Sequence, residues 1–215
     1  MNNDIWYFVL GLLAQGLFSA RMLIQWILSE KAKKVVSPTI YWQLSLLASI
    51  LFSVYGLLRG DFVIILGQLF SYYIYIWNLN SKNNWKRIHL AIRTVILLIP
   101  AAALCYVLYN NEVSIDRLFS NISLWLLLFG SAGQIIFTFR FVYQWWYSRL
   151  RGESVLPLNF WLLSIIGSLI TIAYAIFRED PVLLIGQSFG FITYSRNVWL
   201  IIKNCNEDES KKEIK

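Results

Sequence analysis

Charged residues are scarce in this chain of 215 residues. Asp, Glu, Lys and Arg together make up 14% of the sequence and apolar residues 58%, whereas soluble domains have roughly 25% and 45–50%. A soluble domain of this composition could not cover its surface with polar side chains, and the mean hydropathy of +0.56 excludes a disordered chain. We therefore expect the protein to be surrounded by lipid.

Residues that build catalytic, metal and disulfide sites are also few. The two cysteines, Cys105 and Cys205, form no CxxC pair, and His89 is the single histidine. The sequence has no Ser/His/Asp set, no HExxH motif and no glycine loop that would hold phosphate. The net charge of +7 forms no basic stripe with interleaved aromatics, so nucleic acid is not an expected partner. We expect no catalytic residues, no metal and no cofactor.

Long apolar runs dominate what is present. A helix needs about 20 apolar residues to cross a membrane, and seven runs qualify: residues 5–28, 39–58, 62–79, 88–108, 122–148, 158–177 and 181–202. If successive loops between these runs lie on alternate sides of the membrane, twelve Lys and Arg residues fall on one side and three on the other. The positive-inside rule then predicts a periplasmic N-terminus and a cytoplasmic C-terminus in a bacterial inner membrane. The segment before the first run lacks a positive n-region, so we expect a retained span.

The chain contains an internal duplication. A shift of 119 positions aligns residues 4–81 with 123–200 without a gap. Each copy holds three runs, and because three is an odd number, a second copy that followed directly would be inverted in the membrane. The extra run in the linker 82–121 gives the second copy the same orientation as the first. The predicted fold is an all-α membrane protein with seven transmembrane helices, arranged as two parallel three-helix repeats joined by a linker helix. A charged, flexible tail over 203–215 would follow, and a substrate path commonly lies between parallel repeats.

Polar residues inside the runs recur in both copies and share helix faces. The candidate ligand-binding residues are Arg21, Gln25, Trp42, Ser45, Gln68, Tyr75 and Asn78 in the first copy, and Arg140, Gln144, Trp161, Ser164, Gln187, Tyr194, Arg196 and Asn197 in the second. The interiors of the runs contain arginine but no Asp or Glu, which favours an anionic ligand such as a phosphate. Tryptophan would stack on a sugar, while Gln and Asn would contact its hydroxyl groups. The alternative is structural, since arginine can snorkel and amides can bridge helices.

These residues form the motifs R-x3-Q-W-x2-S, P-x3-W-x2-S, R-x-D-x5-G-Q and Y-x2-N, and the chain resembles the lipid A biosynthesis N-terminal domain family. The first copy departs from the pattern at Phe62 and Trp77, so the second alone supplies Arg196. The resemblance implies a place in lipid A or related glycolipid metabolism and an association with a lipid-A-disaccharide synthase. The architecture also resembles SWEET and PQ-loop transporters, although Gly67-Gln68 and Gly186-Gln187 stand where those families have Pro-Gln.

The leading hypothesis is an inner-membrane protein that binds an anionic lipid-linked saccharide, and the stronger version of this hypothesis adds that the protein translocates the lipid. A first alternative is a non-catalytic anchor or accessory subunit of a membrane glycosyltransferase. A second alternative is a SWEET-like carrier of free sugar. An enzyme in its own right is the least favoured hypothesis, because no soluble sugar-transferring domain is present in the sequence.

Overall fold

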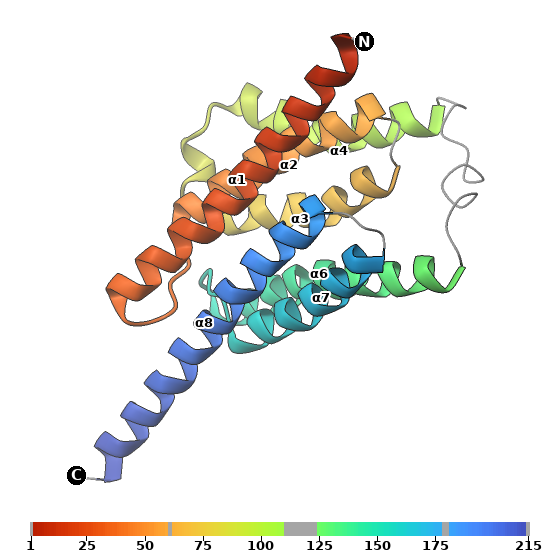
Figure 1. Ribbon diagram of the computed structural model, residues 1–215. Helices are drawn as coiled ribbons and strands as arrows, with labels where there is room; N and C mark the ends of the chain where they lie inside the picture. The colour runs from red at the N-terminus through yellow and green to blue at the C-terminus, as the bar shows by residue number, and fades with distance from the viewer. Residues whose placement is uncertain (1, 60–61, 110–123, 178–180, 214–215) are drawn as a thin grey trace. The chain divides into compact units, whose positions relative to one another are not determined.

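The computed structural model describes residues 2–59, 62–109, 124–177 and 181–213, and these ranges form helices without any strand (Figure 1). The helices are α1 (Asn2–Ala32), α2 (Thr39–Arg59), α3 (Phe62–Ser81), the 3-10 turn η1 (Trp85–Arg87), α4 (Leu90–Tyr109), α6 (Leu124–Arg151), α7 (Leu158–Phe177) and α8 (Pro181–Glu213). The α-helices lie at the seven predicted runs, so the all-helical fold is confirmed. The Arg-x-Asp segments of the motifs, at 59–61 and 178–180, extend outside the described residues.

Two helical segments within the described ranges are long and apolar enough to cross a membrane by length and composition, Val9–Ala32 of α1 and Leu158–Phe177. The segments Thr39–Tyr55 and Leu90–Ala103 are apolar but shorter. Seven transmembrane helices are therefore not confirmed, although seven helices are present at the predicted places. The number of spans remains a prediction.

Helix α8 continues well beyond the predicted end at residue 202 and runs to Glu213. The described part of the tail is thus helical, while its flexibility stays a prediction. Hydropathy misses this extension because its residues are polar, yet Lys and Glu are good helix formers. Lys203 Nζ lies 3.7 Å from Glu207 Oε1, an i, i+4 pair that supports the added turns.

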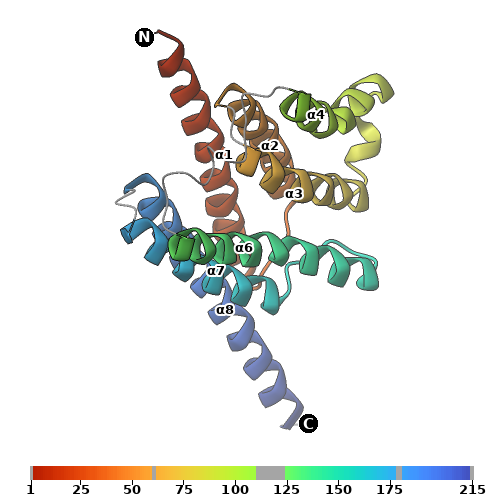
Figure 2. The ribbon, with the colours of Figure 1, turned by 90° about the vertical axis from the view of Figure 1, so that its right-hand side faces the viewer.

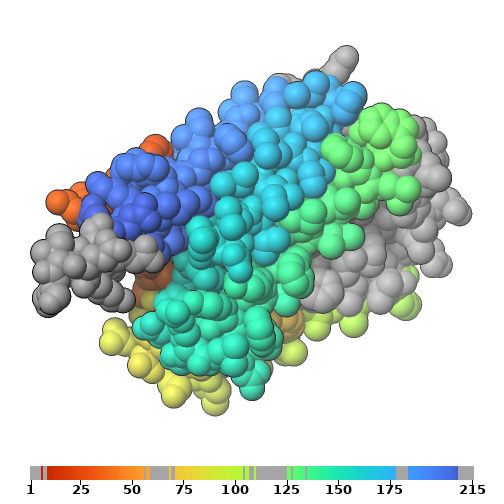
Figure 3. Space-filling model, turned by 90° about the horizontal axis from the view of Figure 1, so that it is seen from below, coloured from red at the N-terminus to blue at the C-terminus, as the bar shows by residue number. Residues whose placement is uncertain are grey.

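The described chain divides into two compact units that do not coincide with the sequence repeats. Unit 1 contains residues 1–21 and 39–128, and unit 2 contains 22–38 and 129–215. Helix α1 therefore begins in unit 1 and ends in unit 2. Within unit 1, α2, α3 and α4 pack against one another (Figure 2). Within unit 2, α7 packs along α8, and Figure 3 shows α6, α7 and α8 on one face, in green to blue.

Close approach of helices depends on glycines that recur in the two copies. An added Cβ at Gly11 of α1 would lie 3.1 Å from the Tyr55 ring of α2. At the equivalent Gly130 of α6, it would lie 2.7 Å from the Tyr174 ring of α7. Glycine thus lets each tyrosine pack directly against the neighbouring helix backbone.

Replacing Gly130 with alanine is expected to lower the free energy of unfolding by about 1–3 kcal/mol, because the new methyl group overlaps the Tyr174 ring. Thermal unfolding in detergent, followed by circular dichroism, measures the effect. Gly186→Ala is the matched control, since nothing lies within 4 Å of its added Cβ. Equal stability of the two variants would contradict the contact.

The turn after α1 forces a lysine into left-handed backbone geometry. Lys33 has φ of 53°, and the equivalent position in the second copy is Gly152 with φ of 71°. Glycine adopts this conformation without the steric cost that a Cβ brings. The second copy therefore has the better residue at this helix end.

Lys33→Gly is accordingly expected to stabilise the protein by about 1 kcal/mol, since it removes left-handed strain at an exposed site. The measurement is the shift in the unfolding midpoint. Lys34→Gly, one residue later and also exposed, is the control and should give no stabilisation. A loss of stability in Lys33→Gly would show that the side chain contributes more than the strain costs.

Pro100 leaves one backbone hydrogen bond of α4 unmade, and a tyrosine of α3 bonds to the free carbonyl. Pro100 has no N–H, so the carbonyl of Ile96 lacks its usual partner one turn later. Tyr72 Oη donates to this Ile96 carbonyl at 2.7 Å, and Tyr73 Oη donates to the Leu97 carbonyl at 3.2 Å. The linker helix is thereby joined to the third helix of the first copy.

Candidate functional site

Each unit encloses a guanidinium group among aromatic rings. In unit 1, Arg21 is 5% exposed. Its Cζ lies 4.7, 5.1 and 5.6 Å from the ring centroids of Phe18, Tyr41 and Tyr75. Nη1 donates to Ser45 Oγ at 2.6 Å, so α1 is tied to α2 beside the rings.

In unit 2, the equivalent Arg140 is 2% exposed and lies among four rings. Its Cζ is 3.5 Å from the centroid of Phe137, 4.7 Å from Phe141, 5.4 Å from Phe160 and 5.3 Å from Tyr194. Nε and Nη1 are buried and have no hydrogen-bond partner. Rings stabilise a cation through their π faces but supply no acceptor for its N–H groups.

The two tryptophans predicted to stack on a sugar are fully buried in their units. Trp42 and Trp161 are both 0% exposed. Each is tilted against the tyrosine of the third helix of its copy, Tyr75 or Tyr194, with 6.1 Å between ring centroids. The indole Nε1 of Trp161 is buried without a hydrogen-bond partner.

The Gln and Ser of the first motif hold the loop that follows their helix. Gln144 Nε2 donates to Ser148 Oγ and to the Val155 carbonyl, both at 2.9 Å. Val155 N–H donates in turn to Ser148 Oγ at 3.1 Å. Both side chains are 0% exposed, and this clamp shapes the loop that leads to α7. The recurrence of this motif therefore has a structural explanation.

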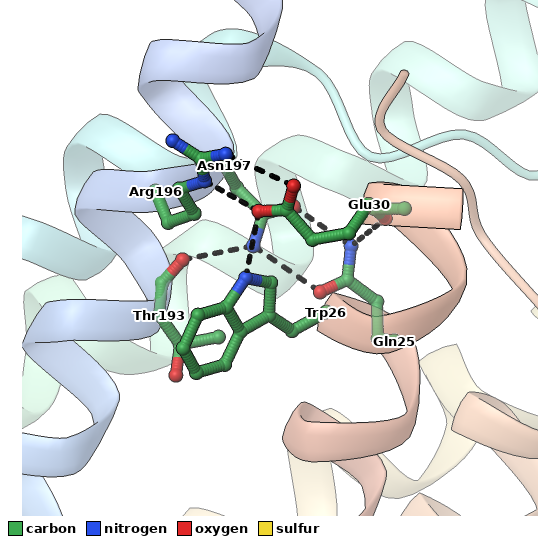
Figure 4. A network of polar contacts seen from close by, with 7 residues as sticks. Gln25, Trp26, Glu30, Thr193, Arg196 and Asn197 are labelled. Carbon is green, nitrogen blue, oxygen red and sulfur yellow. Dashed lines mark hydrogen bonds and ion pairs between the residues drawn. The ribbon is translucent and has the colours of Figure 1, made fainter. Parts of the chain in front are cut away.

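In the first copy, Gln25 makes the same kind of clamp and also reaches α8. Its Nε2 donates to Ser29 Oγ at 2.9 Å and to the Val36 carbonyl at 3.4 Å. It also donates to Asn197 Oδ1 at 2.9 Å, while Asn197 Nδ2 donates to Gln25 Oε1 at 3.2 Å (Figure 4). Asn197 Nδ2 further donates to the Thr193 carbonyl. This reciprocal amide pair, 0% exposed on both sides, joins the first copy to the second within unit 2.

Arg196 directly precedes Asn197 on α8 and is bound by Glu30, an acid that was not among the predicted site residues. Its Nε and Nη2 donate to the two carboxylate oxygens of Glu30, and Nη2 lies 2.9 Å from Oε2 (Figure 4). Trp26 Nε1 donates to the same carboxylate at 3.0 Å. The equivalent positions of the other copy hold Trp77 and Arg149, so this ion pair has no counterpart there.

Three further predicted residues, Gln68, Asn78 and Ser164, form hydrogen bonds inside their own unit. Gln68 Oε1 accepts a hydrogen bond from Ser49 at 2.9 Å. Asn78 and Ser164 each donate to the backbone carbonyl one turn earlier, at 2.9 and 2.6 Å. Gln187 Oε1 is buried without a hydrogen-bond partner.

The structure thus distributes the predicted residues over both units. Unit 1 holds Arg21, Trp42, Ser45, Gln68, Tyr75 and Asn78; unit 2 holds Gln25, Arg140, Gln144, Trp161, Ser164, Gln187, Tyr194, Arg196 and Asn197. Sequence reasoning missed Glu30 and the rings around the arginines. The contact with phenylalanine could have been predicted from the sequence, because Phe18 and Phe137 recur at the repeat spacing, one turn before each arginine.

Comparison with known proteins places these residues in a family. The family described as Lipid A Biosynthesis N-terminal domain matches two segments, residues 10–80 and 129–199. The chain belongs to this family. The two segments are themselves 119 positions apart, as the duplication predicts, and the suspected resemblance is confirmed.

Similar curated proteins are lipid-A-disaccharide synthases. The synthase of Chlamydia felis is 30% identical over 212 residues, covering 93% of this chain and 34% of the relative. Those of Chlamydia pneumoniae and Chlamydia caviae are 29% and 27% identical, each over 90% of this chain and 33% of the relative. The chain therefore spans about a third of the length of these relatives. No solved structure matches it, so the resemblance to SWEET and PQ-loop transporters stays a prediction.

Proposed function

We propose that this chain is an integral protein of the bacterial inner membrane that binds an anionic lipid-linked saccharide in lipid A or related glycolipid metabolism, and that it translocates this lipid. The observation that carries the proposal is Arg140, a permanently charged side chain that is 2% exposed and has two unpaired N–H groups. Membership in the family supports the metabolic context.

The energetics of Arg140 favour an anionic ligand. Burying an unpaired ion costs several kcal/mol even after relaxation, whereas cation–π contacts return about 2 kcal/mol when desolvated. The rings therefore offset only part of the cost. A phosphate oxygen accepting from Nε and Nη1 would supply the rest, because charge-assisted hydrogen bonds to a guanidinium are among the strongest in proteins.

Exposed apolar side chains support the membrane part of the proposal. Leu90, Val95 and Leu98 of α4 are 68%, 62% and 59% exposed, and Leu128 and Ile135 of α6 are 61% and 67% exposed. Water would penalise these surfaces and hydrocarbon would not. The distribution of basic residues supports a periplasmic N-terminus and a cytoplasmic C-terminus.

The test uses the full chain reconstituted in vesicles of phosphatidylethanolamine and phosphatidylglycerol. Fluorescently labelled lipid A is the probe, binding is measured by fluorescence anisotropy, and translocation by quenching of the label with an added reductant. The wild-type chain should bind and flip the probe, and Arg21→Gln/Arg140→Gln should do neither. Unchanged binding in this double variant would refute the proposal, while binding without flipping would refute translocation alone.

A non-catalytic accessory role for a glycosyltransferase is the second candidate. It is favoured by the length of the relatives, which are named as synthases and of which this chain spans about a third. The accessory role predicts that a membrane glycosyltransferase co-purifies with the chain after gentle extraction. Co-purification that survives loss of both arginines would favour it over the binding protein.

A further inference from the structure

The two copies contain the same polar residues but bond them differently. In unit 1, Arg21 Nη1 donates to Ser45 Oγ at 2.6 Å, and Ser49 Oγ donates to Gln68 Oε1 at 2.9 Å. These bonds join α1 to α2 and α2 to α3. The polar side chains of unit 1 therefore serve to hold neighbouring helices together.

Ser45 Oγ also donates to its own helix, at the Tyr41 carbonyl. In unit 2, the equivalent serines keep such bonds within α7 but accept no bond from Arg140 Nη1 and give none to Gln187 Oε1. Ser164 Oγ donates to the Phe160 carbonyl at 2.6 Å, and Ser168 Oγ donates to the Ile165 carbonyl at 2.9 Å. In unit 1 the equivalent serines bond to Arg21 and Gln68, which correspond to Arg140 and Gln187 in unit 2. Arg140 Nη1 and Gln187 Oε1 are buried without a hydrogen-bond partner. The arginine and the glutamine that join helices in unit 1 therefore have, in unit 2, donors and an acceptor without hydrogen bonds.

Three of these unpaired atoms belong to residues that lie beside one ring, that of Tyr194. The Tyr194 centroid lies 5.3 Å from Arg140 Cζ and 6.1 Å from the Trp161 ring centroid. Gln187 precedes Tyr194 by seven residues on α8, so both lie on one helix face. The Nε1 of Trp161 adds a third unpaired buried donor to Arg140 Nε and Nη1. Buried polar atoms are paired in the great majority of native sites. Three unpaired donors at one ring, with the unpaired Gln187 Oε1 two turns away on the same face of α8, therefore point to a ligand.

We propose that unit 2 alone receives the ligand and that the ligand is a phosphorylated sugar; this rests on the proposed function and narrows it to one site. Arg140 and Trp161 donate to phosphate oxygens, while Gln187 Oε1 accepts a hydrogen bond from a sugar hydroxyl. The equivalent residues of unit 1 are structural. A bare carboxylate or a phosphodiester without hydroxyl groups would leave Gln187 unpaired, at a cost that the sugar avoids.

Aromatic composition favours the same unit. Arg140 has four ring centroids within 5.4 Å of its Cζ, and three of these rings are phenylalanine. Rings without hydroxyl groups lower the local dielectric, which strengthens the attraction between guanidinium and phosphate. The head group of a glycolipid and a free sugar phosphate share this chemistry.

The experiment compares matched variants of the two copies in the full chain, purified in detergent and titrated by calorimetry. Three probes distinguish the ligand source: lipid A, glucosamine 1-phosphate and inorganic phosphate. Arg140→Gln should weaken binding of lipid A more than tenfold, and Trp161→Phe and Gln187→Leu about three- to tenfold. The matched Arg21→Gln should weaken it less than threefold and lower the unfolding midpoint instead.

The outcomes separate the two proposals. Equal loss of affinity in Arg21→Gln and Arg140→Gln would overturn the assignment to unit 2 while leaving the proposed function standing. Undiminished binding in both variants would overturn both. Trp161→Phe and Gln187→Leu keep the test decisive if Arg140→Gln does not fold. Binding of glucosamine 1-phosphate as tight as lipid A would assign a soluble source, and inorganic phosphate bound equally well would overturn the sugar contact of Gln187.

Discussion

Replacing Arg140 with methionine is expected to stabilise the ligand-free protein by about 1–3 kcal/mol while abolishing binding of a phosphorylated glycolipid. The buried guanidinium has two unpaired N–H groups, and several kcal/mol of desolvation cost outweigh the cation–π contribution of about 2 kcal/mol. Methionine fills a similar volume without a charge. Thermal unfolding in detergent and titration with lipid A measure the two effects.

Arg21→Met is the matched control within the same chain. It removes the hydrogen bond from Nη1 to Ser45 that joins α1 to α2, so it should lower the unfolding midpoint, whereas Arg140→Met raises it. A destabilised Arg140→Met variant would mean that the guanidinium is held for structure, and it would remove the main support for an anion site.

Replacing Gln25 with leucine is expected to lower the free energy of unfolding by about 2–4 kcal/mol. Leucine leaves the buried Asn197 amide and Ser29 hydroxyl without the bonds that Gln25 supplies, and each unsatisfied buried group costs about 1–3 kcal/mol. Because Gln25 belongs to the first copy and Asn197 to the second, the substitution loosens the contact that joins them in unit 2. Unfolding of the purified chain measures the loss.

A double-mutant cycle shows how much of this loss belongs to the amide pair. Gln25→Leu with Asn197→Leu should cost less than the sum of the two single variants by about 1 kcal/mol, since no amide is then left unpaired. Gln43→Leu on the exposed face of α2 is the control and should change stability by less than about 0.5 kcal/mol. Strict additivity in the cycle would contradict a direct bond.

Helix positions and the buried arginines could be predicted because their signals are local. Apolar runs and the repeat of 119 residues place the helices within a few residues of where they are found, with the end of α8 as the exception. There the Lys203–Glu207 pair continues the helix through residues that hydropathy assigns to solvent. Arg21 and Arg140 were identified by their recurrence, and both are buried.

Hydrogen-bond partners could not be predicted in the same way. Glu30 and Arg196 are 166 residues apart, and the repeat itself pointed away from them because the other copy has Arg149 and Trp77. Gln25 and Gln144 are equivalent in sequence, yet Gln25 makes a reciprocal pair with Asn197. Nothing in the chain near either residue indicates which helix will lie beside it.

The amino-acid sequence alone determined the helical class, the duplication, the family and the set of polar side chains that must be accommodated inside the helices, because each depends on composition or on spacing along one chain. Only the tertiary structure decided that Arg21 is held by Ser45 while Arg140, in the same motif, keeps two unpaired donors. The reason is that a hydrogen bond forms within about 3 Å, and side-chain rotamers and helix packing set distances on that scale.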